Sequence, residues 1–211
     1  MEQAPARGRS KGDKRARTRA SLIAAAGELV RDQGFERTTL EAVARRAGMT
    51  RGAIYGNFKN RDELFMALAE GHAAPIVPQV RPGASFAEHM HALAEAVVAA
   101  IPQRRRSAVG ALSFKAYSLT HEEMAARVLQ TTRETYDSMI QGMEAAPEGA
   151  LPMPARCFVP VLHALVEGLL MQRFLTPELV PDEVFHAAFA AFADAAEGAS
   201  RRKGNRPPAP G

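Results

Sequence analysis

The 211-residue sequence predicts an all-α protein. Apolar residues recur at three- and four-residue intervals through most of the chain, which is the period of helices with one buried face. No segment alternates apolar and polar residues for long enough to form a convincing strand, and no internal repeat is evident. Glycine, proline and helix-capping residues divide the chain into about nine helices.

The first four predicted helices follow one another with little linker. Gly34 ends the first of them, because glycine readily takes the left-handed conformation found after helices. Thr39 and Thr50 are N-cap residues for the second and third helices, and Asn60 begins the fourth. These helices span residues 16–34, 40–47, 51–58 and 61–74.

Five further helices are predicted in the rest of the chain. Ser85 caps the first of them, and Pro102 ends it because proline lacks the amide hydrogen that a helix interior uses. The segment 155–175 is apolar almost all round, which is typical of a helix that is deeply buried or shared with another subunit. The five helices span residues 86–101, 104–119, 121–146, 155–175 and 182–199.

The charge is distributed unevenly along the chain. Residues 1–62 hold 14 basic and 7 acidic residues, whereas residues 63–198 hold 9 and 16. A basic segment joined to an acidic body favours nucleic-acid binding, since Lys and Arg beside phosphates release counterions. A solvated basic tail, or attraction to a membrane surface, explains the charge alone equally well. The predicted organisation is a disordered basic arm (1–14), a DNA-binding domain (15–62), a ligand-binding and dimerisation domain (63–198) and a disordered tail (199–211).

The composition excludes several classes of protein. With 46% hydrophobic and 24% charged residues, the chain resembles ordinary soluble globular proteins. Cys157 is the single cysteine, so an internal disulfide or a cysteine zinc cluster is excluded and a reducing compartment is expected. No secretory signal and no apolar run approaching the ~18 residues of a membrane helix are found, which predicts a cytoplasmic protein without a membrane partner. No metal-binding histidine pattern, phosphate loop or nucleophile elbow occurs, so we expect no metal, no cofactor and no enzymatic activity.

Two short helices meet across a glycine turn in residues 39–58, which is the pattern of a helix-turn-helix. Gly48 can take the positive φ of the turn, while Val43 and Ile54 point inward and join the helices. The second helix of such a motif enters the major groove with its N-terminus first. A plain helical hairpin, with Tyr55 packed inside and the arginines in solvent, is the alternative. The residues expected to reach base edges or phosphates are Arg17, Thr38, Thr39, Thr50, Arg51, Gly52, Tyr55, Asn57 and Lys59.

The segment GFERTTLEAVARRAGMTRGAIYGNFKNRDELF resembles the DNA-binding domain of the TetR/AcrR family of bacterial transcriptional regulators. The resemblance covers roughly residues 15–66 and is specific in its AVARRAGMTRGAIYGNF core. Asn57 departs from the family pattern, in which His or Tyr usually precedes Phe58. The resemblance implies a homodimer that binds a palindromic operator in double-stranded DNA and represses transcription until a small-molecule effector releases it. It also implies that the last two helices form the dimer interface.

The C-terminal domain offers candidate residues for a ligand and for a dimer. Nine methionines and ten phenylalanines without a tryptophan indicate a deformable apolar interior. Plain core packing is the competing interpretation for each of them, and His163 is either a satisfied core histidine or a polar ligand contact. The candidate ligand-binding residues are Met90, Phe114, Tyr117, Met139, Met143, Phe158 and His163. The candidate interface residues, which would build a symmetric four-helix contact, are Leu165, Leu169, Phe185, Phe189 and Phe192.

The sequence therefore predicts a homodimeric, ligand-responsive repressor that binds DNA. Two recognition helices about 34–36 Å apart would read successive faces of the major groove. An effector would shift the helix at residues 61–74 and so change that spacing. Two alternatives remain open: a DNA-binding regulator without an inducer, and a small-molecule carrier or enzyme whose helix-turn-helix is vestigial.

Overall fold

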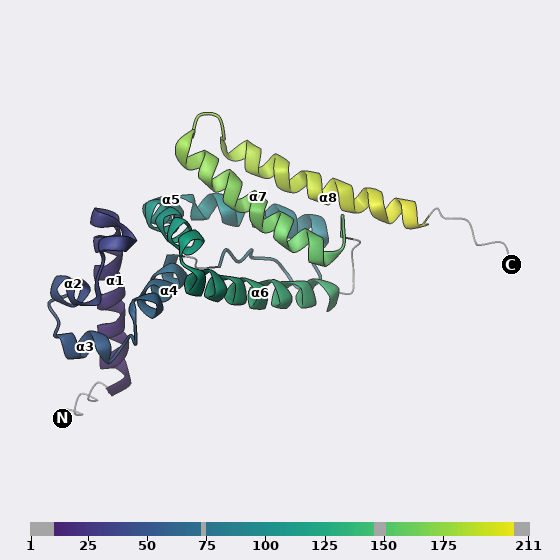
Figure 1. The fold of residues 1–211 in the computed structure, drawn as a ribbon. Helices are drawn as coiled ribbons and strands as arrows, with labels where there is room; N and C mark the ends of the chain where they lie inside the picture. Colours follow the sequence, from purple (N-terminus) through teal and green to yellow (C-terminus); the bar gives the residue numbers. More distant parts are fainter. Residues whose placement is uncertain (1–10, 73–74, 146–150, 205–211) are drawn as a thin grey trace, which may run out of the picture. The chain divides into compact units, whose positions relative to one another are not determined.

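The computed structural model describes residues 11–72, 75–145 and 151–204, and these residues form eight helices and no strand (Figure 1). The predicted all-α fold class is confirmed. The helices are α1 (Lys11–Arg37), α2 (Leu40–Arg46), α3 (Arg51–Tyr55), α4 (Arg61–His72), α5 (Phe86–Thr120), α6 (Glu122–Ala145), α7 (Ala155–Leu175) and α8 (Asp182–Gly204).

The chain divides into two compact units, and two of the three boundaries between them fall inside helices α5 and α6. The first unit holds Met1–Ala74 and Val109–Ala125, and the second holds Pro75–Ala108 and Ala126–Gly211. Helix α4 therefore belongs to the same unit as α1, α2 and α3, whereas the sequence-based division places residues 63–74 with the C-terminal domain. The end of α5 and the start of α6 also belong to the first unit.

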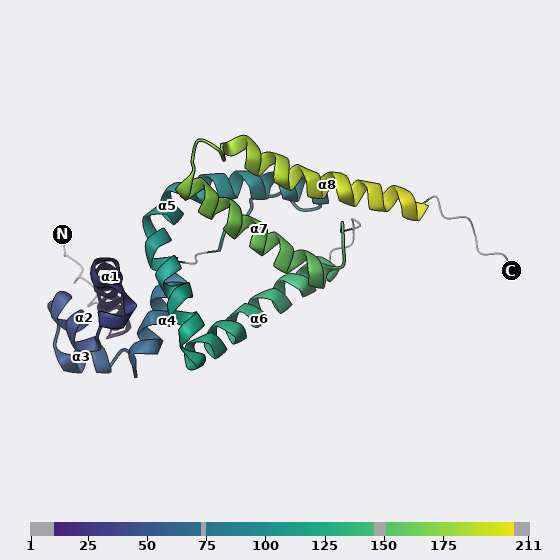
Figure 2. The ribbon, with the colours of Figure 1, turned by 45° about the horizontal axis from the view of Figure 1, so that its top comes forward.

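In the first unit, α2, α3 and α4 lie against α1 (Figure 2). An aromatic cluster joins α1 to α4, because the ring centroids of Phe35 and Phe65 lie 4.6 Å apart in an edge-to-face contact. The buried ring of Tyr117, from α5, lies 5.6 Å from each of these two rings. Residues 109–125 thus contribute directly to the core of the first unit.

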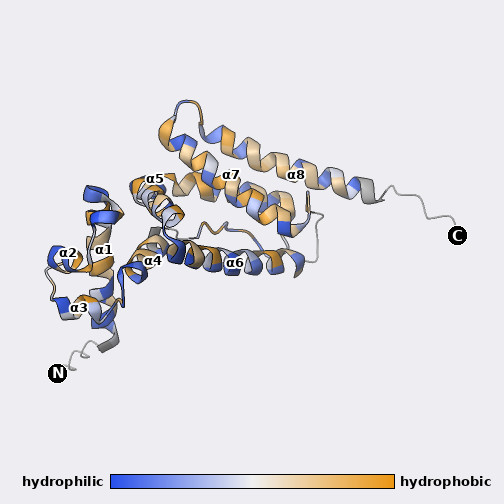
Figure 3. Cartoon of the chain, viewed as in Figure 1, coloured by the Kyte–Doolittle hydropathy of each residue, from blue (hydrophilic) through white to orange (hydrophobic). Residues whose placement is uncertain are grey.

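The core of the second unit is built on phenylalanines of α7 and α8, which lie side by side in Figures 1 and 2. Phe158, Phe185 and Phe189 are completely buried, and the Phe158 ring makes an edge-to-face contact with Phe192 at 5.2 Å. Met90 of α5 is buried in the same cluster. Hydrophobic residues run along both α7 and α8 (Figure 3).

Helix α7 is strongly apolar, yet much of it lies outside this core. Among the described residues it is the one helix that is long and apolar enough to cross a membrane, with a mean hydropathy of 1.3 over an 18-residue window. The expectation that no segment approaches this length is therefore wrong. Length and composition alone are weak evidence for a membrane span, because core helices meet the same test. Since only 22% of the window is buried, the chain leaves an apolar helix surface uncovered.

Helix α5 is one helix where the sequence predicts two. The backbone stays helical through Pro102, so the predicted end at this residue is wrong and about nine helices become eight. Proline removes one amide donor and disfavours a helix interior by about 3 kcal/mol. In a helix of 35 residues the hydrogen bonds on both sides of Pro102 can offset that local loss.

Helix α1 begins earlier than predicted, and its helical backbone is interrupted at the predicted end, Gly34. It starts at Lys11, so residues 11–14 are helical and not part of a disordered arm. Two of these four residues, Lys11 and Lys14, are lysines, which are good helix formers, and Asp13 lies in the first turn, where an acidic residue is favourable. Gly34, the predicted end, interrupts the helical backbone with a φ of 81°, and helical residues then continue to Arg37. The predicted disorder of residues 1–10 lies outside the described residues.

Helix α8 continues to Gly204, so residues 199–204 are helical where the sequence predicts a disordered tail. Arg201 pairs with Glu197 one turn earlier at 3.5 Å. Such i, i+4 pairs, and basic residues near a helix C-terminus, favour the helical state. The remainder of the predicted tail, residues 205–211, lies outside the described residues.

Candidate nucleic-acid interface

Helices α2 and α3 meet across a tight turn at Gly48, as the sequence predicts. Gly48 has a φ of 65°, a left-handed conformation that costs residues with a Cβ about 1–2 kcal/mol. The Met49 amide donates to the Ala44 carbonyl at 2.8 Å and closes the turn. Val43 and Ile54 are completely buried in the core of the first unit. The predicted helix-turn-helix and its inward-facing residues are confirmed.

Threonine hydroxyls fix the first turns of α2 and α3. Thr39 Oγ1 accepts a hydrogen bond from the Ala42 amide at 3.1 Å, and Thr50 Oγ1 accepts one from the Ala53 amide at 3.2 Å. Both predicted caps are therefore confirmed. The Thr50 cap fixes the start of α3 at Arg51, which places that side chain in the first turn of the helix.

Most of the residues predicted to contact DNA are exposed. Arg51 exposes 75% of its side chain and Tyr55 is 44% exposed, and both belong to α3. The interpretation in which Tyr55 is packed inside is therefore wrong. Gly52 lies between them in sequence and adds no side chain to the surface. The exposed members of the predicted set are Arg17, Thr39, Thr50, Arg51, Gly52, Tyr55 and Lys59.

Thr38 and Asn57 do not face outward, contrary to prediction. Thr38 is completely buried, and its hydroxyl donates to the Gly34 carbonyl at 2.8 Å. Asn57 is half-buried, and its Nδ2 donates to the Ala53 carbonyl at 2.8 Å. Both side chains satisfy carbonyls that the ends of helices leave without an amide partner. They therefore hold the motif together and do not belong to its outer face.

Two arginines of α1 hold the segment that follows α3. Arg19 Nη1 donates to the Asn57 carbonyl at 2.9 Å, and its guanidinium lies 4.3 Å from the centre of the Phe58 ring. Arg15 Nη2 donates to the Gly56 carbonyl at 3.5 Å.

Both arginines line a hollow of about 450 Å³. Within the described part of the chain, the buried Oδ1 of Asn57 has no hydrogen-bond partner. The helical periodicity of the sequence does not predict these contacts.

Glu41, in the first turn of α2, is a residue that sequence reasoning misses. Its Oε1 accepts a hydrogen bond from the Tyr55 hydroxyl at 2.8 Å and lies 3.4 Å from Arg51 Nη2. The Arg51 guanidinium also lies 5.5 Å from the centre of the Tyr55 ring. The Tyr55 hydrogen bond, a backbone hydrogen bond and the Arg51 charge together lower the pKa of Glu41. The sequence offers one signal for Glu41, because it is the only acidic residue between Arg37 and Arg61.

A second polar cluster ties α4 to residues 109–125 within the first unit. Arg61 Nη2 donates to the Tyr117 hydroxyl at 2.7 Å, and its Nη1 donates to the Glu36 carbonyl at 3.3 Å. The His121 ring stacks on Tyr117 at 3.7 Å, and its Nε2 lies 3.7 Å from the Glu36 carboxylate. These contacts join residues far apart in sequence, so no local pattern predicts them.

The predicted ligand-binding residues do not converge on one site. Phe114 and Tyr117 pack in the core of the first unit, whereas Met90, Met143 and Phe158 pack in the core of the second. These five residues take the core positions that sequence analysis gives as the competing interpretation.

Met139 and His163 are exposed, so His163 is not the satisfied core histidine that the sequence favours. It exposes 48% of its side chain on α7. Its Nδ1 lies 2.6 Å from the Tyr136 hydroxyl, and its Nε2 lies 3.7 Å from the Glu167 carboxylate. Partial burial raises the pKa of Tyr136. His163 thus belongs to a polar group shared by α6 and α7.

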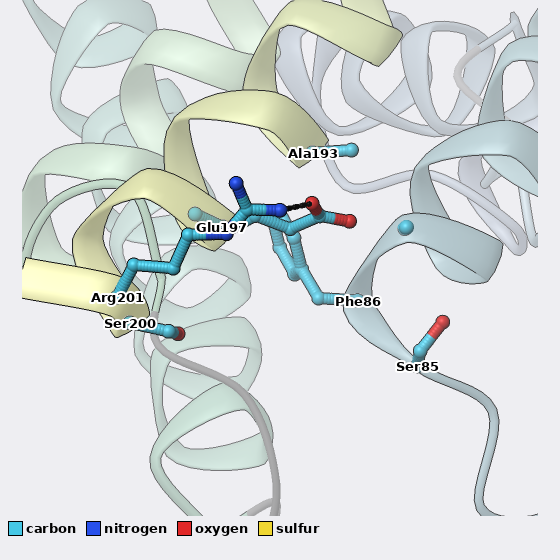
Figure 4. Close-up of a pocket in the computed structure, with 8 residues that line it drawn as sticks. Ser85, Phe86, Ala193, Glu197, Ser200 and Arg201 are labelled. Carbon is cyan, nitrogen blue, oxygen red and sulfur yellow. Dashed lines mark hydrogen bonds and ion pairs between the residues drawn. The ribbon is translucent and has the colours of Figure 1, made fainter. Parts of the chain in front are cut away.

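A hollow of about 320 Å³ lies in the second unit between the start of α5 and the last turns of α8 (Figure 4). Glu197 and Arg201 form an ion pair there. The predicted ligand-binding residues are not among those that line it. The lining residues are Ser85, Phe86, Ala87, Ala193, Ala196, Glu197, Ser200 and Arg201.

The predicted dimer-interface residues differ in burial. Phe185 and Phe189 are completely buried in the core of their own unit, so the prediction that they meet another subunit is wrong. Both rings pack against α7 of the same chain, so they are not available to a second subunit. Leu165, Leu169 and Phe192 are half-buried.

A different set of α7 residues forms an exposed face, which we call the α7 stripe. Its members are separated by three, four or seven residues, which places them on one face of the helix. The stripe consists of Cys157, Val161, Ala164, Gly168 and Leu175, all of them exposed. Its two large apolar side chains, Val161 and Leu175, are 43% and 68% exposed.

Comparison with known proteins identifies relatives of the first unit. The model of the family described as bacterial regulatory proteins, tetR family, matches residues 22–68. The HTH-type transcriptional regulator TtgR of Pseudomonas putida is 49% identical over 53 residues, which are 25% of each protein. TtgW of the same species, also described as an HTH-type transcriptional regulator, is 32% identical over 91 residues, 42% of this chain and 68% of TtgW. A SmeT–triclosan complex has a TM-score of 0.54 at 22% identity and covers 83% of this chain and 88% of SmeT.

The fold and the exposed α3 face define a regulator of the helix-turn-helix class. The chain belongs to the tetR family of bacterial regulatory proteins. The residues that the family model matches all lie in the first unit. The match with TtgR covers only a quarter of its length, and the likeness to SmeT shows a shared fold.

Proposed function

We propose that this protein is a homodimeric repressor that binds a palindromic operator in double-stranded DNA and leaves it when a small-molecule effector binds. The observation that carries the proposal is the exposed face of α3, where Arg51, Gly52 and Tyr55 follow the Thr50 cap. A helix presented in this way fits the major groove with its N-terminus first. Membership of a family of regulatory proteins, and the names of its relatives, support the same function.

Arg51 is the residue we assign to base reading. Its guanidinium can donate two parallel hydrogen bonds, which suit the O6 and N7 atoms of guanine. Gly52 lets the backbone of α3 approach the DNA closely. Phosphate contacts, which fix register and carry no sequence information, fall to Arg17, Thr39, Thr50, Tyr55 and Lys59.

A second copy of the chain is part of the proposal because one recognition helix reads only a few base pairs. Two helices about 34–36 Å apart read successive major-groove faces and so match a palindrome. The exposed α7 stripe is the surface on which we place the second copy. A two-fold axis would bury the same apolar face on both subunits. The half-buried Leu165, Leu169 and Phe192 would lie at the edges of that contact.

We assign effector binding to the second unit. Residues 63–198, which supply most of it, are acidic overall, and this favours a cationic or neutral apolar compound. The hollow beside α8 and the Tyr136–His163 pair are candidate sites of contact. The triclosan bound to SmeT supports a small apolar molecule as a ligand for this fold.

The proposed release works through α4, which belongs to the same compact unit as the helix-turn-helix. An effector that favours a different position of α4 would change the spacing of the two α3 helices. The effector must therefore bind the DNA-free spacing more tightly than the DNA-bound one. Tight effector binding without any loss of DNA affinity would contradict this part of the proposal.

The relatives are named as regulators of transcription, and we propose no enzymatic activity, metal or cofactor for this chain. A regulator of bacterial transcription acts where the chromosome lies. We therefore place the protein in the cytoplasm.

The first test is binding of the purified protein to the DNA immediately upstream of its own coding region, at two salt concentrations. We expect saturable binding that survives random competitor DNA, with two protomers or a multiple of two per palindrome. Binding that ignores sequence and vanishes at the higher salt concentration would reduce the interface to a basic surface and contradict the proposal.

Arg51→Ala tests the base-reading assignment. Loss of one bidentate base contact should cost about 1–3 kcal/mol of binding free energy and relax the preference at one base pair. The measurement is titration against the binding site and against its single-base variants. Arg31→Ala, at an exposed arginine of α1, is the matched control and should leave the preference intact. A uniform loss with a smaller salt dependence would instead assign Arg51 to a phosphate, and no loss would remove it from the interface.

A further inference from the structure

The carboxylate of Glu41 lies directly against two residues of the proposed DNA-reading face. It accepts the Tyr55 hydroxyl at 2.8 Å and pairs with Arg51 at 3.4 Å. These partners are the first and the last residues of α3, so one acidic group spans the whole helix. It is itself about half exposed, with 46% of the side chain accessible.

A negative charge at this place opposes the attraction of DNA phosphates. Exposed ion pairs are individually weak, and phosphates can compete for the same guanidinium. A phosphate that captures Arg51 competes with Glu41 for the guanidinium and comes to lie close to a carboxylate of the same charge. The gain of the new contact is offset by that repulsion, so binding to random DNA is weakened.

A contact between Arg51 and a base does not require that Arg51 exchange Glu41 for another negatively charged partner. A guanine edge is uncharged, so the Glu41 carboxylate does not repel it, and a guanidinium with five N–H donors can stay beside Glu41 while it offers another edge to the base. The Tyr55 hydrogen bond limits the freedom of the carboxylate, and the carboxylate in turn limits the freedom of Arg51. The ion pair thus restricts the orientations of the guanidinium before DNA arrives, which lowers the cost of ordering it.

We infer that Glu41 is a positioning residue that sets specificity, since it holds Arg51 for base reading and repels phosphates that would otherwise capture it. The inference rests on the proposed DNA-binding function. In this arrangement the carboxylate weakens non-specific binding while supporting specific binding, which is discrimination through a repulsive element.

The test compares wild type and Glu41→Gln on two probes. One is the duplex pool that the wild-type protein enriches from a random 30-base-pair library, and the other is the unselected library. Glutamine still accepts the Tyr55 hydroxyl but carries no charge. We expect Glu41→Gln to bind the unselected library about two- to fivefold more tightly, the size of an exposed ion pair, and the selected pool no more tightly than wild type. The specificity ratio should fall about two- to fivefold.

Two further measurements separate this role from a general change of charge or of folding. For the unselected library, the slope of log affinity against log salt concentration should steepen by about one in Glu41→Gln, because Arg51 gains a phosphate. Glu70→Gln, at an exposed carboxylate of α4, removes the same charge and should leave the specificity ratio unchanged. In an Arg51→Ala background, Glu41→Gln should also leave the ratio unchanged.

Equal ratios for wild type and Glu41→Gln, or a fall of the same size in Glu70→Gln, would overturn the inference while DNA binding stands. A fall that persists in the Arg51→Ala background would show that Glu41 does not act through Arg51. If the wild-type protein enriches no sequence at all, the proposed function itself is wrong and the inference falls with it.

Discussion

Gly48 and Gly142 provide a matched pair in which backbone conformation alone decides the effect of a methyl group. A Cβ built on either residue meets no atom within 4 Å. Gly48 has a φ of 65°, whereas Gly142 lies inside helix α6. We expect Gly48→Ala to lower the free energy of unfolding by about 1–2 kcal/mol, since the left-handed conformation penalises a Cβ.

Gly142→Ala should instead raise the free energy of unfolding by about 0.5–1 kcal/mol, because alanine loses less entropy than glycine in a helix. Urea unfolding at one protein concentration measures both changes. Equal changes in the free energy of unfolding for the two substitutions would contradict the assignment, because they would show that the positive φ of Gly48 does not penalise a Cβ.

Side chains that act within a few residues were predictable from the sequence. Thr39 and Thr50 cap the helices they precede, and each reaches an amide only three residues further on. The contact between Glu41 and Tyr55 was not predictable, because it depends on how α2 and α3 pack. Thr38 shows the same limit, since its burial follows from the core that forms around it.

At the level of elements, the N-terminus of α5 depends on a reciprocal cap between Ser85 and Glu88. Ser85 Oγ accepts from the Glu88 amide at 3.2 Å, and Glu88 Oε2 accepts from the Ser85 amide at 2.7 Å. The Ser85 amide, then Arg81 and the Ser85 hydroxyl, lower the pKa of Glu88 from 4.5 to about 2. The carboxylate therefore stabilises the folded state above its unfolded pKa, and this contribution is lost as the pH falls from about 4.5 to about 2.

Glu88→Gln should remove this pH-dependent contribution. The difference in melting temperature between wild type and the variant should be largest near pH 6 and should shrink as the pH falls to 3, since the carboxyl of the unfolded wild type is protonated in this range while the folded one stays ionised. Thermal unfolding monitored by circular dichroism over this range measures it. Arg81→Met keeps the carboxyl and its bond to the Ser85 amide, so its profile should lie between the other two. A constant difference at every pH would contradict the assignment.

The type of each element was easier to predict than its ends. Periodicity identified every helix of the structure, because one buried face repeats along each of them. Local signals misplaced the ends, since Pro102 breaks a helix by propensity but lies inside α5. Basic residues at 11–14 and 199–204 look like solvated tails, yet they extend α1 and α8. A helix that is already formed propagates at little cost, which sequence composition does not show.

For the molecule as a whole, the sequence did not reveal that residues 109–125 share a core with the helix-turn-helix. The buried ring of Tyr117 and its hydrogen bond to Arg61 connect positions far apart in the chain. Charge and motif pointed to the exposed face of α3 that we propose reads DNA, because that information lies in consecutive residues. The ligand site could not be assigned in this way, since its apolar candidates have the same pattern as a core.

Assembly of two subunits through the α7 stripe is the remaining whole-molecule expectation. Ala164 lies in the middle of the stripe and is exposed. A two-fold contact would bury both copies of an arginine placed there, and an unpaired buried charge costs about 3–5 kcal/mol. We therefore expect Ala164→Arg to raise the dimer dissociation constant at least about a hundredfold, as measured by sedimentation equilibrium.

Ala126→Arg, at an exposed alanine of α6 in the same unit, makes the identical change outside the stripe and should leave the dimer intact. Operator binding provides a second readout, because a monomer holds only one recognition helix. Ala164→Arg should bind a single half-site as well as wild type does but should lose the gain that a full palindrome gives. A stable dimer of Ala164→Arg, with an undiminished preference for the palindrome, would show that the subunits meet through another surface.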